Sequence, residues 1–173
     1  MRQTLCVLAL LTAAGSVNAK VVDNQANGFE VSETVEIGAP ADKVWDALGQ
    51  IGSWWDSEHT YSGSARNLSI ELRPGGCFCE SLPGGGGVGH MLVVYVRPDT
   101  VVRLSGALGP LQSTGASGHM TWTLKETARH STLFTLTYDV GGYAIGGLGK
   151  WAAPVDKVLG QQAARLKQYV EVR

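Results

Sequence analysis

The sequence predicts an α+β domain in which a curved antiparallel sheet of about seven strands wraps around one long C-terminal helix. In the middle of the chain, apolar and polar residues alternate, as they do in strands that bury one face. In segment 148–172, apolar residues instead recur every three or four positions, which is typical of an amphipathic helix. The 23 glycines show no Gly-X-Y period and indicate many turns and bulges.

The first 19 residues are predicted to be a secretory signal peptide rather than part of the fold. Arg2 supplies a positive charge, residues 5–14 are an apolar run, and the tripeptide at 17–19 (Val-Asn-Ala) resembles a small-x-small cleavage site. The apolar run is well below the roughly 20 residues that cross a bilayer. We expect cleavage after Ala19, no stable membrane anchor, and a secreted or periplasmic chain. An uncleaved anchor is the alternative.

The first predicted strand covers residues 29–37 and ends at the Gly-Ala-Pro step 38–40. Two short helices should follow it. Residues 41–48 repeat apolar side chains at helical spacing, with Pro40 beside the start, where its missing N–H costs little. Residues 51–55 read as a second helical turn.

Six further strands are expected before the long helix. They cover residues 68–72, 77–82, 90–96, 101–108, 120–125 and 133–138, with a glycine-rich hairpin loop at 83–89. The last two have the clearest alternation. In the helix that follows, Pro154 marks either the start or a kink in the first turn. Sheet and helix each have one apolar face, and they can bury both by packing together in a helix-grip arrangement.

Composition excludes some functions. Apolar residues make up 44% of the chain and charged residues 17%, which predicts a packed core. The formal net charge is −1, so no excess of basic residues is available to neutralise nucleic-acid phosphates.

Cysteine and histidine spacing gives no sign of a metal or other cofactor. Cys77 and Cys79 would share one face of a strand, and we interpret them as two small thiols. A disulfide between them, the alternative, would be strained and labile. The four histidines have no metal-ligand spacing and are each interpreted as structural or surface residues. They are His59, His90, His119 and His130.

Three segments carry a resemblance to a known family. They are VEIGAPADKVWDAL at 35–48, the Trp54-Trp55 pair, and AAPVDKVLGQQAARLKQYVE at 152–171. With them the chain resembles the SRPBCC (START-like) superfamily, and within it the polyketide cyclase and heat-shock-protein ATPase-activator-like branch. The resemblance covers residues 29–171, which would form one domain. It implies a cavity between sheet and helix that takes hydrophobic ligands, and it leaves the chemistry open, since some members are enzymes.

Aromatic residues on the short helices, the inner sheet face and the long helix are the candidate ligand-binding residues. Taken singly, each is more simply explained as part of a plain core, and the set as a whole is the evidence for a cavity. The candidates are Trp54, Trp55, Tyr61, Tyr95, Trp122, Phe134, Tyr138, Trp151 and Val155.

Acid–base candidates are weaker. Those considered are Glu33, Glu71, Glu80, Arg103 and Asp139. Glu33 shares its strand face with apolar residues, so it is either half-buried or at an open edge of the sheet, and the edge is favoured. The best cluster is Asp56, Glu58, His59 and Tyr61, which a solvated loop explains as well.

The sequence therefore predicts an exported protein that binds a small hydrophobic ligand, lipid or polyketide-like, between sheet and helix. A polyketide cyclase/dehydratase-like enzyme acting in the same cavity is the alternative. A chaperone-activator role is disfavoured because its partner would be cytosolic. Nucleic acid is not an expected partner.

Overall fold

The computed structural model describes residues 18–127 and 129–173. The predicted signal peptide therefore lies outside the described residues, apart from its last two positions, which begin the first strand. In the described part of the chain, neither α1 nor α2 has the length and apolar content of a transmembrane helix.

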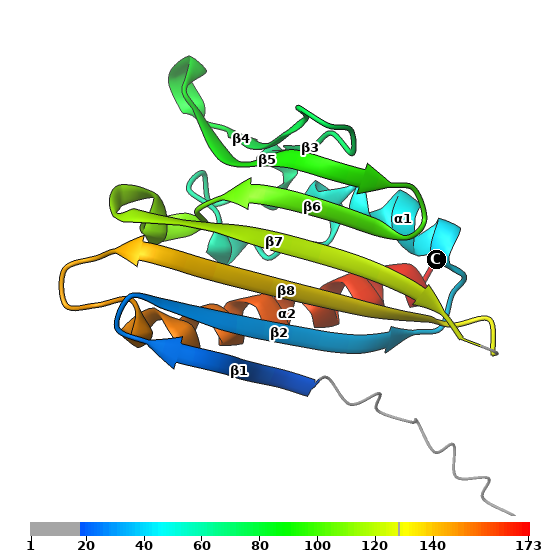
Figure 1. Ribbon diagram of the computed structural model, residues 1–173. Helices are drawn as coiled ribbons and strands as arrows, with labels where there is room; N and C mark the ends of the chain where they lie inside the picture. The colour runs from blue at the N-terminus through cyan, green and yellow to red at the C-terminus, as the bar shows by residue number, and fades with distance from the viewer. Residues whose placement is uncertain (1–17, 128) are drawn as a thin grey trace, which may run out of the picture.

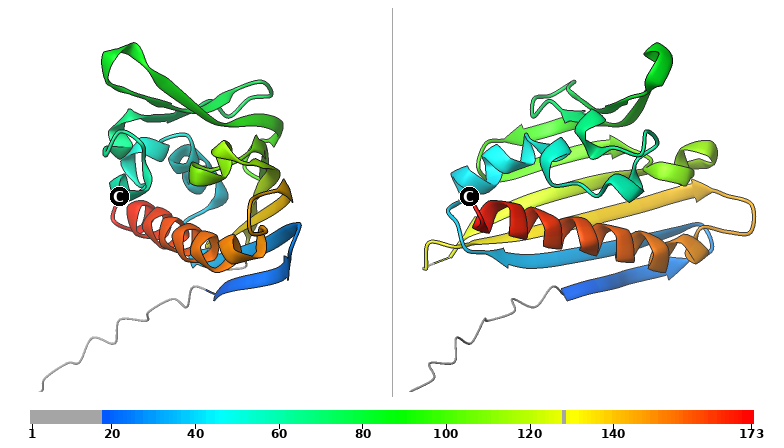
Figure 2. Two further views of the ribbon diagram at one scale, coloured as in Figure 1. Left: turned by 90° about the vertical axis from the view of Figure 1, so that its left-hand side faces the viewer. Right: turned by 180° about the vertical axis from the view of Figure 1, so that it is seen from behind.

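The described residues form one eight-stranded sheet with a long helix on its concave face, which confirms the predicted α+β arrangement (Figures 1 and 2). The strands are β1 (Asn18–Gln25), β2 (Gly28–Ile37), β3 (Leu68–Ile70), β4 (Cys77–Ser81), β5 (Gly87–Arg97), β6 (Val101–Gly106), β7 (Gly115–Glu126) and β8 (Thr132–Tyr143). Their order is β1-β2-β8-β7-β6-β5-β4-β3, and every neighbouring pair is antiparallel.

Two α-helices and six short 3₁₀ helices complete the fold. They are α1 (Ala41–Leu48), η1 (Ile51–Ser53), η2 (Ser57–His59), η3 (Ala65–Asn67), η4 (Pro83–Gly85), η5 (Gly109–Ser113), η6 (Gly149–Trp151) and α2 (Ala152–Glu171). Helix α2 begins four residues later than the predicted segment, and Pro154 lies in its first turn, where a missing N–H breaks no intrahelical bond.

The sheet has one strand more than the seven expected, because β1 was not predicted. Its sequence, NAKVVDNQ, has no clear alternation, and it overlaps the expected cleavage site. Pairing with β2 makes it a strand. The short helices consequently follow the second strand of the structure, not the first.

Alternation places the core as the sequence predicted. On β7, Met120, Trp122 and Leu124 are buried, and their neighbours on β8 are buried in the same way. From the opposite side, α2 buries Leu159, Ala163 and Leu166.

Helix α2 does not lie over the middle of the sheet. It packs mainly against β2 and β1, with little contact to β8. The remaining concave face is covered by α1 and by the segment 51–67, as the end-on view in Figure 2 shows. The space between these two covers is where the pocket described below lies.

Glu33 is fully buried under α2, so its expected position at an open edge was wrong. The physical reason is β1, which pairs outside β2 and makes β2 an interior strand. The carboxylate lies beneath Gly160, where a Cβ would come within 3.1 Å of Glu33 Oε2. Among the described residues, neither oxygen of Glu33 has a hydrogen-bond partner. Burial, followed by the charge of nearby Asp156, raises the pKa of Glu33 to about 8.

We expect Glu33→Gln to change how stability depends on pH. Between pH 4.5 and about 8, the unfolded chain is ionised at Glu33 while the folded protein keeps the proton. The free energy of unfolding of the wild type therefore falls as pH rises through this window, and glutamine removes that contribution. Urea unfolding should give similar free energies of unfolding for wild type and variant at pH 4.5. At pH 8, the free energy of unfolding of the variant should have risen relative to that of the wild type.

Glu30→Gln is the matched control, since Glu30 lies on the same strand with its side chain toward the opposite face. The interpretation fails if Glu33→Gln and Glu30→Gln follow the same pH profile.

Candidate functional site

A cavity of about 670 Å³ lies between the start of α2, the η5 segment, and the β3–β4 part of the sheet. This volume is within the range of small-molecule sites. Its wall is mainly apolar. The apolar side chains come from the sheet and η5 on one side and from α2 on the other, and they include Leu68, Phe78, Leu111, Val155, Val158 and Leu159.

The α2 side of the wall follows from helical spacing. Trp151, Val155 and Val158 are separated by four and three residues, so they share one face of the helix and its preceding turn. All three are half-buried and border the cavity. This face continues the apolar stripe that buries Leu159 against the sheet.

Four of the candidate ligand-binding residues border the cavity: Trp55, Tyr61, Trp151 and Val155. Four others are buried in the core outside it: Trp54, Trp122, Phe134 and Tyr138. Trp54 packs between the other tryptophans, with ring centroids 5.7 Å from Trp55 and 6.4 Å from Trp122. Trp54 therefore lies outside the cavity and packs against Trp55, which borders it.

Tyr95 does not face the cavity, and this expectation was wrong. Its side chain is 46% exposed on the outer face of the sheet, with the Arg103 guanidinium 5.6 Å from its ring centroid. The reason is a β-bulge between Val93 and Tyr95. Val93 points inward, but the extra residue in the bulge reverses the alternation, so Tyr95 points outward.

Polar contacts from α2 hold the segment that covers the cavity. The Gln162 Oε1 atom accepts a hydrogen bond from the Asp56 backbone N–H at 2.8 Å. The Arg165 Nε atom donates to the Trp54 carbonyl at 2.8 Å. Within the segment, Trp55 Nε1 donates to the His59 carbonyl at 3.1 Å. These bonds fix the tryptophan pair relative to the helix.

The predicted acid–base cluster is only partly brought together. Glu58, His59 and Tyr61 border the cavity, whereas Asp56 does not. Asp56 caps η2 by accepting from the Glu58 backbone N–H at 3.0 Å. His59 Nε2 lies 3.0 Å from Gln161 Oε1 on α2. Glu58, His59 and Asp56 are therefore not joined to one another through their side chains in a proton-transfer chain.

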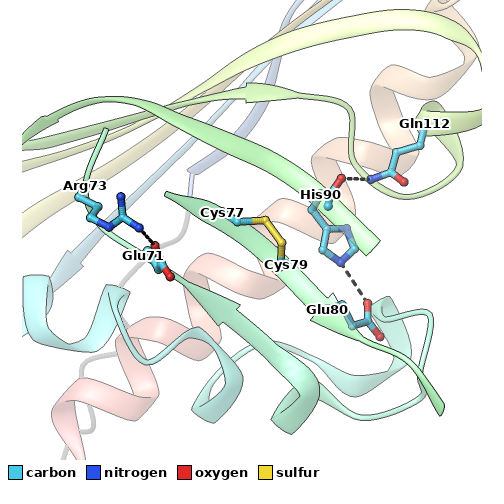
Figure 3. Close-up of a disulfide and its surroundings, with 8 residues drawn as sticks. Glu71, Arg73, Cys77, Cys79, Glu80, His90 and Gln112 are labelled. Carbon is cyan, nitrogen blue, oxygen red and sulfur yellow. Dashed lines mark hydrogen bonds and ion pairs between the residues drawn. A yellow bond between two sulfur atoms is a disulfide. The ribbon is translucent and has the colours of Figure 1, made fainter. Parts of the chain in front are cut away.

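A buried pair of titratable residues, Glu80 and His90, lies at the cavity instead, and His90 is the member that borders it (Figure 3). The Glu80 carboxylate accepts from the backbone N–H groups of Tyr61 and Ser62 at 3.1 and 2.5 Å, and His90 Nε2 lies 3.0 Å away. Burial alone would raise the pKa of Glu80, but these hydrogen bonds outweigh it and hold the pKa below its usual value. Burial lowers the pKa of His90, although Glu80 opposes the shift.

The sequence pattern did not predict that Glu80 and His90 are partners, because a second β-bulge interrupts the β4–β5 pairing. In a regular β4–β5 hairpin that pairs Phe78 with Met91, His90 would lie opposite Cys79 and point outward. The structure pairs Cys79 with Gly89, so His90 is the extra residue, and both it and Met91 are buried. Our interpretation of His90 as an isolated structural residue therefore missed its partner.

Cys77 and Cys79 form a disulfide on the face of β4 opposite Phe78 and Glu80 (Figure 3). This corrects our interpretation of them as two thiols. Within residues 18–127 and 129–173, no group of three or more His, Cys, Asp or Glu side chains is placed to bind a metal ion.

Tyr61 links two segments at the rim of the cavity. Its hydroxyl donates to the Gly109 carbonyl of η5 at 2.8 Å, and its side chain is 53% exposed. Its ring lies beside the His90 ring, with centroids 6.0 Å apart.

Comparison with known proteins places these features in a family context. Residues 28–171 match the profile of the family described as polyketide cyclase / dehydrase and lipid transport. No curated protein sequence matches the chain.

Solved structures share the fold at low sequence identity. The solution structure of CalU16 from Micromonospora echinospora is 14% identical, with a TM-score of 0.60, covering 92% of this chain and 77% of its own. The conserved protein of unknown function EF2215 from Enterococcus faecalis is 19% identical, with a TM-score of 0.58, covering 90% and 77%. The di-domain ARO/CYC protein BexL from the BE-7585A biosynthetic pathway is 19% identical, with a TM-score of 0.55, covering 87% of this chain and 51% of its own.

We expect Glu80→Gln to destabilise the protein by about 2–4 kcal/mol at pH 7, because a neutral amide replaces a buried carboxylate that binds three donors. Glu71→Gln is the control, since Glu71 forms an exposed ion pair with Arg73 and its loss should cost less than about 1 kcal/mol (Figure 3). Urea unfolding measures both. Equal losses would contradict the structural role of Glu80.

Proposed function

Because the chain belongs to the polyketide cyclase / dehydrase and lipid transport family, we propose that it holds a small hydrophobic ligand, lipid or polyketide-like, in the cavity beside α2. The observation that carries this proposal is the apolar cavity of about 670 Å³ at the junction of α2, η5 and the sheet. A cavity of this size is large enough for a multi-ring or acyl compound.

Burial of apolar surface supplies the binding energy in this proposal. Each 100 Å² of apolar ligand surface removed from water contributes roughly 2.5 kcal/mol before the cost of association. Aromatic rings of Trp55, Phe78 and Trp151 border the cavity and favour a flat or ring-containing ligand.

Val158→Trp tests the proposal by filling the cavity from α2. The probe is N-phenyl-1-naphthylamine, a neutral compound whose fluorescence rises on transfer to an apolar site. We expect the wild type to bind it and Val158→Trp to bind it at least tenfold more weakly, because the indole occupies the ligand's volume. Val170→Trp is the control, since Val170 is a half-buried residue about three turns further along α2, outside the cavity. No saturable binding to the wild type would overturn the proposal.

A cyclase/dehydratase-like enzyme acting in the same cavity is the second candidate function. The Glu80–His90 pair favours it, because a histidine oriented by a carboxylate can transfer protons. The two candidate functions differ in the fate of the ligand. A binding protein releases its ligand unchanged, whereas an enzyme alters the bonding of the ligand on incubation.

We also propose that the protein is exported as a chain that begins at Lys20. The charged, apolar and small-residue regions of segment 1–19 support this proposal. The Cys77–Cys79 disulfide supports it as well, since disulfides persist mainly in oxidising compartments.

The denatured mass of the protein, expressed from its full sequence and purified from the periplasm or medium, tests the export proposal. We expect the mass of residues 20–173. Ala19→Lys should block processing, because signal cleavage requires a small residue at that position. A soluble wild-type protein that retains residues 1–19 would contradict the proposal.

A further inference from the structure

The hydrogen-bonding state of His90 follows from its partner. An ionised carboxylate only accepts hydrogen bonds, and the backbone of Tyr61 and Ser62 already donates to Glu80. At 3.0 Å from Glu80 Oε2, His90 Nε2 must therefore carry a hydrogen atom and donate it. When the imidazole is neutral, its lone pair is then on Nδ1.

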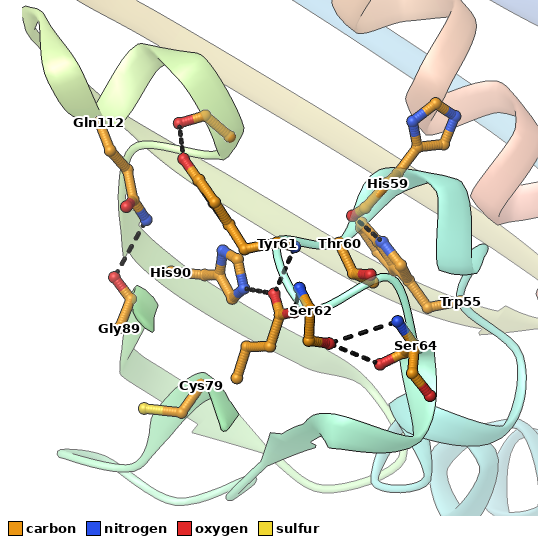
Figure 4. Close-up of polar contacts among 12 residues, drawn as sticks. Trp55, His59, Thr60, Tyr61, Ser62, Ser64, Cys79, Gly89, His90 and Gln112 are labelled. Atoms are coloured by element: carbon orange, nitrogen blue, oxygen red, sulfur yellow. Dashed lines mark hydrogen bonds and ion pairs between the residues drawn. The ribbon is translucent and has the colours of Figure 1, made fainter. Parts of the chain in front are cut away.

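The His90 ring is held in place beside the cavity. It packs 4.9 Å from the Phe78 ring and 6.0 Å from the Tyr61 ring, measured between centroids, and only 6% of the residue is exposed. Since Nε2 is the atom that faces Glu80, Nδ1 lies on a different edge of the His90 ring, which Figure 4 shows beside Tyr61. Among the described residues, no group forms a hydrogen bond to this nitrogen. His90 itself borders the mainly apolar cavity, so its unpartnered Nδ1 is the acceptor that this wall can offer.

The hydroxyl groups that border the cavity are all committed to backbone carbonyls. Tyr61 donates to Gly109, and Thr60 donates to Ser57. Ser113 donates to Pro110. None of these side chains supplies a hydrogen to His90, so the hydrogen for Nδ1 is left to water or to a molecule in the cavity.

We propose that Nδ1 of His90 accepts a hydrogen bond from the hydroxyl group of an otherwise apolar ring compound, a phenol or an enol, bound in the cavity. The inference rests on the proposed binding function and specifies its ligand class. A carboxylate ligand would meet the lone pair of Nδ1 and the nearby charge of Glu80. A buried ammonium group would lose its hydration against an apolar wall, at a cost of several kcal/mol. A neutral hydroxyl avoids both penalties.

Two probes of nearly equal shape test this inference: 2-naphthol, which has a hydroxyl donor, and 2-methoxynaphthalene, which has none. Their dissociation constants are measured by tryptophan fluorescence for the wild type, His90→Gln and His119→Gln at pH 7. Glutamine keeps an N–H near the position of Nε2 and lacks the Nδ1 acceptor. His119 is an exposed histidine on β7 that does not border the cavity.

We expect the preference for 2-naphthol over 2-methoxynaphthalene to fall three- to tenfold, roughly the contribution of one hydrogen bond, in His90→Gln and to be unchanged in His119→Gln. An unchanged preference in His90→Gln, with both probes still bound, overturns the inference and leaves the binding function standing. Failure of both probes to bind the wild type overturns the binding function, and the inference with it.

A measurement on the wild type tests the inference even if the His90→Gln variant does not fold. The ¹⁵N NMR signals of the His90 ring should show hydrogen on Nε2 and none on Nδ1. Addition of 2-naphthol should shift the Nδ1 signal, whereas 2-methoxynaphthalene should not. Hydrogen on Nδ1 in the free protein would contradict the inference.

Discussion

One helix cannot cover eight strands, and the rest of the structure depends on this mismatch. Eight strands spaced by about 4.8 Å give a sheet roughly 34 Å wide, whereas a helix with its side chains is about 10–12 Å across. Helix α2 packs mainly over β1 and β2, so the chain must cover the rest of the concave face with α1 and the segment 51–67. The two covers do not close completely against each other, and the cavity is the space left between them.

Hydrogen bonds near both ends hold the segment 51–67 in place over the sheet. Gln162 and Arg165 on α2 hold its start through backbone groups of Asp56 and Trp54. Glu80 on β4 holds its end through the backbone N–H groups after Thr60. The carboxylate that fixes this loop also orients His90, so the shape of the cavity and the polarity of one point on its wall have a common origin.

Alternation and helical spacing predicted most of the fold, because β7, β8 and α2 each have one clearly apolar face. The site was harder to predict for two physical reasons. Aromatic residues follow the same pattern whether they border a cavity, as Trp55 does, or fill the core, as Trp122 does. The β-bulges that turn Tyr95 outward and His90 inward depend on pairing between strands, which the local pattern does not encode. Glu33 was misplaced because β1, whose sequence has no clear alternation, was not predicted.

The bond from Tyr61 to Gly109 has a consequence for the timing of ligand exchange. It joins the rim segments through an exposed tyrosine, so water can replace it when the segments part, at a net cost of about 1 kcal/mol. For the ligand proposed above, arrival would therefore meet a small barrier at the rim. Departure would have to return apolar surface to water and would be much slower. Under this proposal, the lifetime of the complex, rather than the speed of its formation, would distinguish one occupant from another.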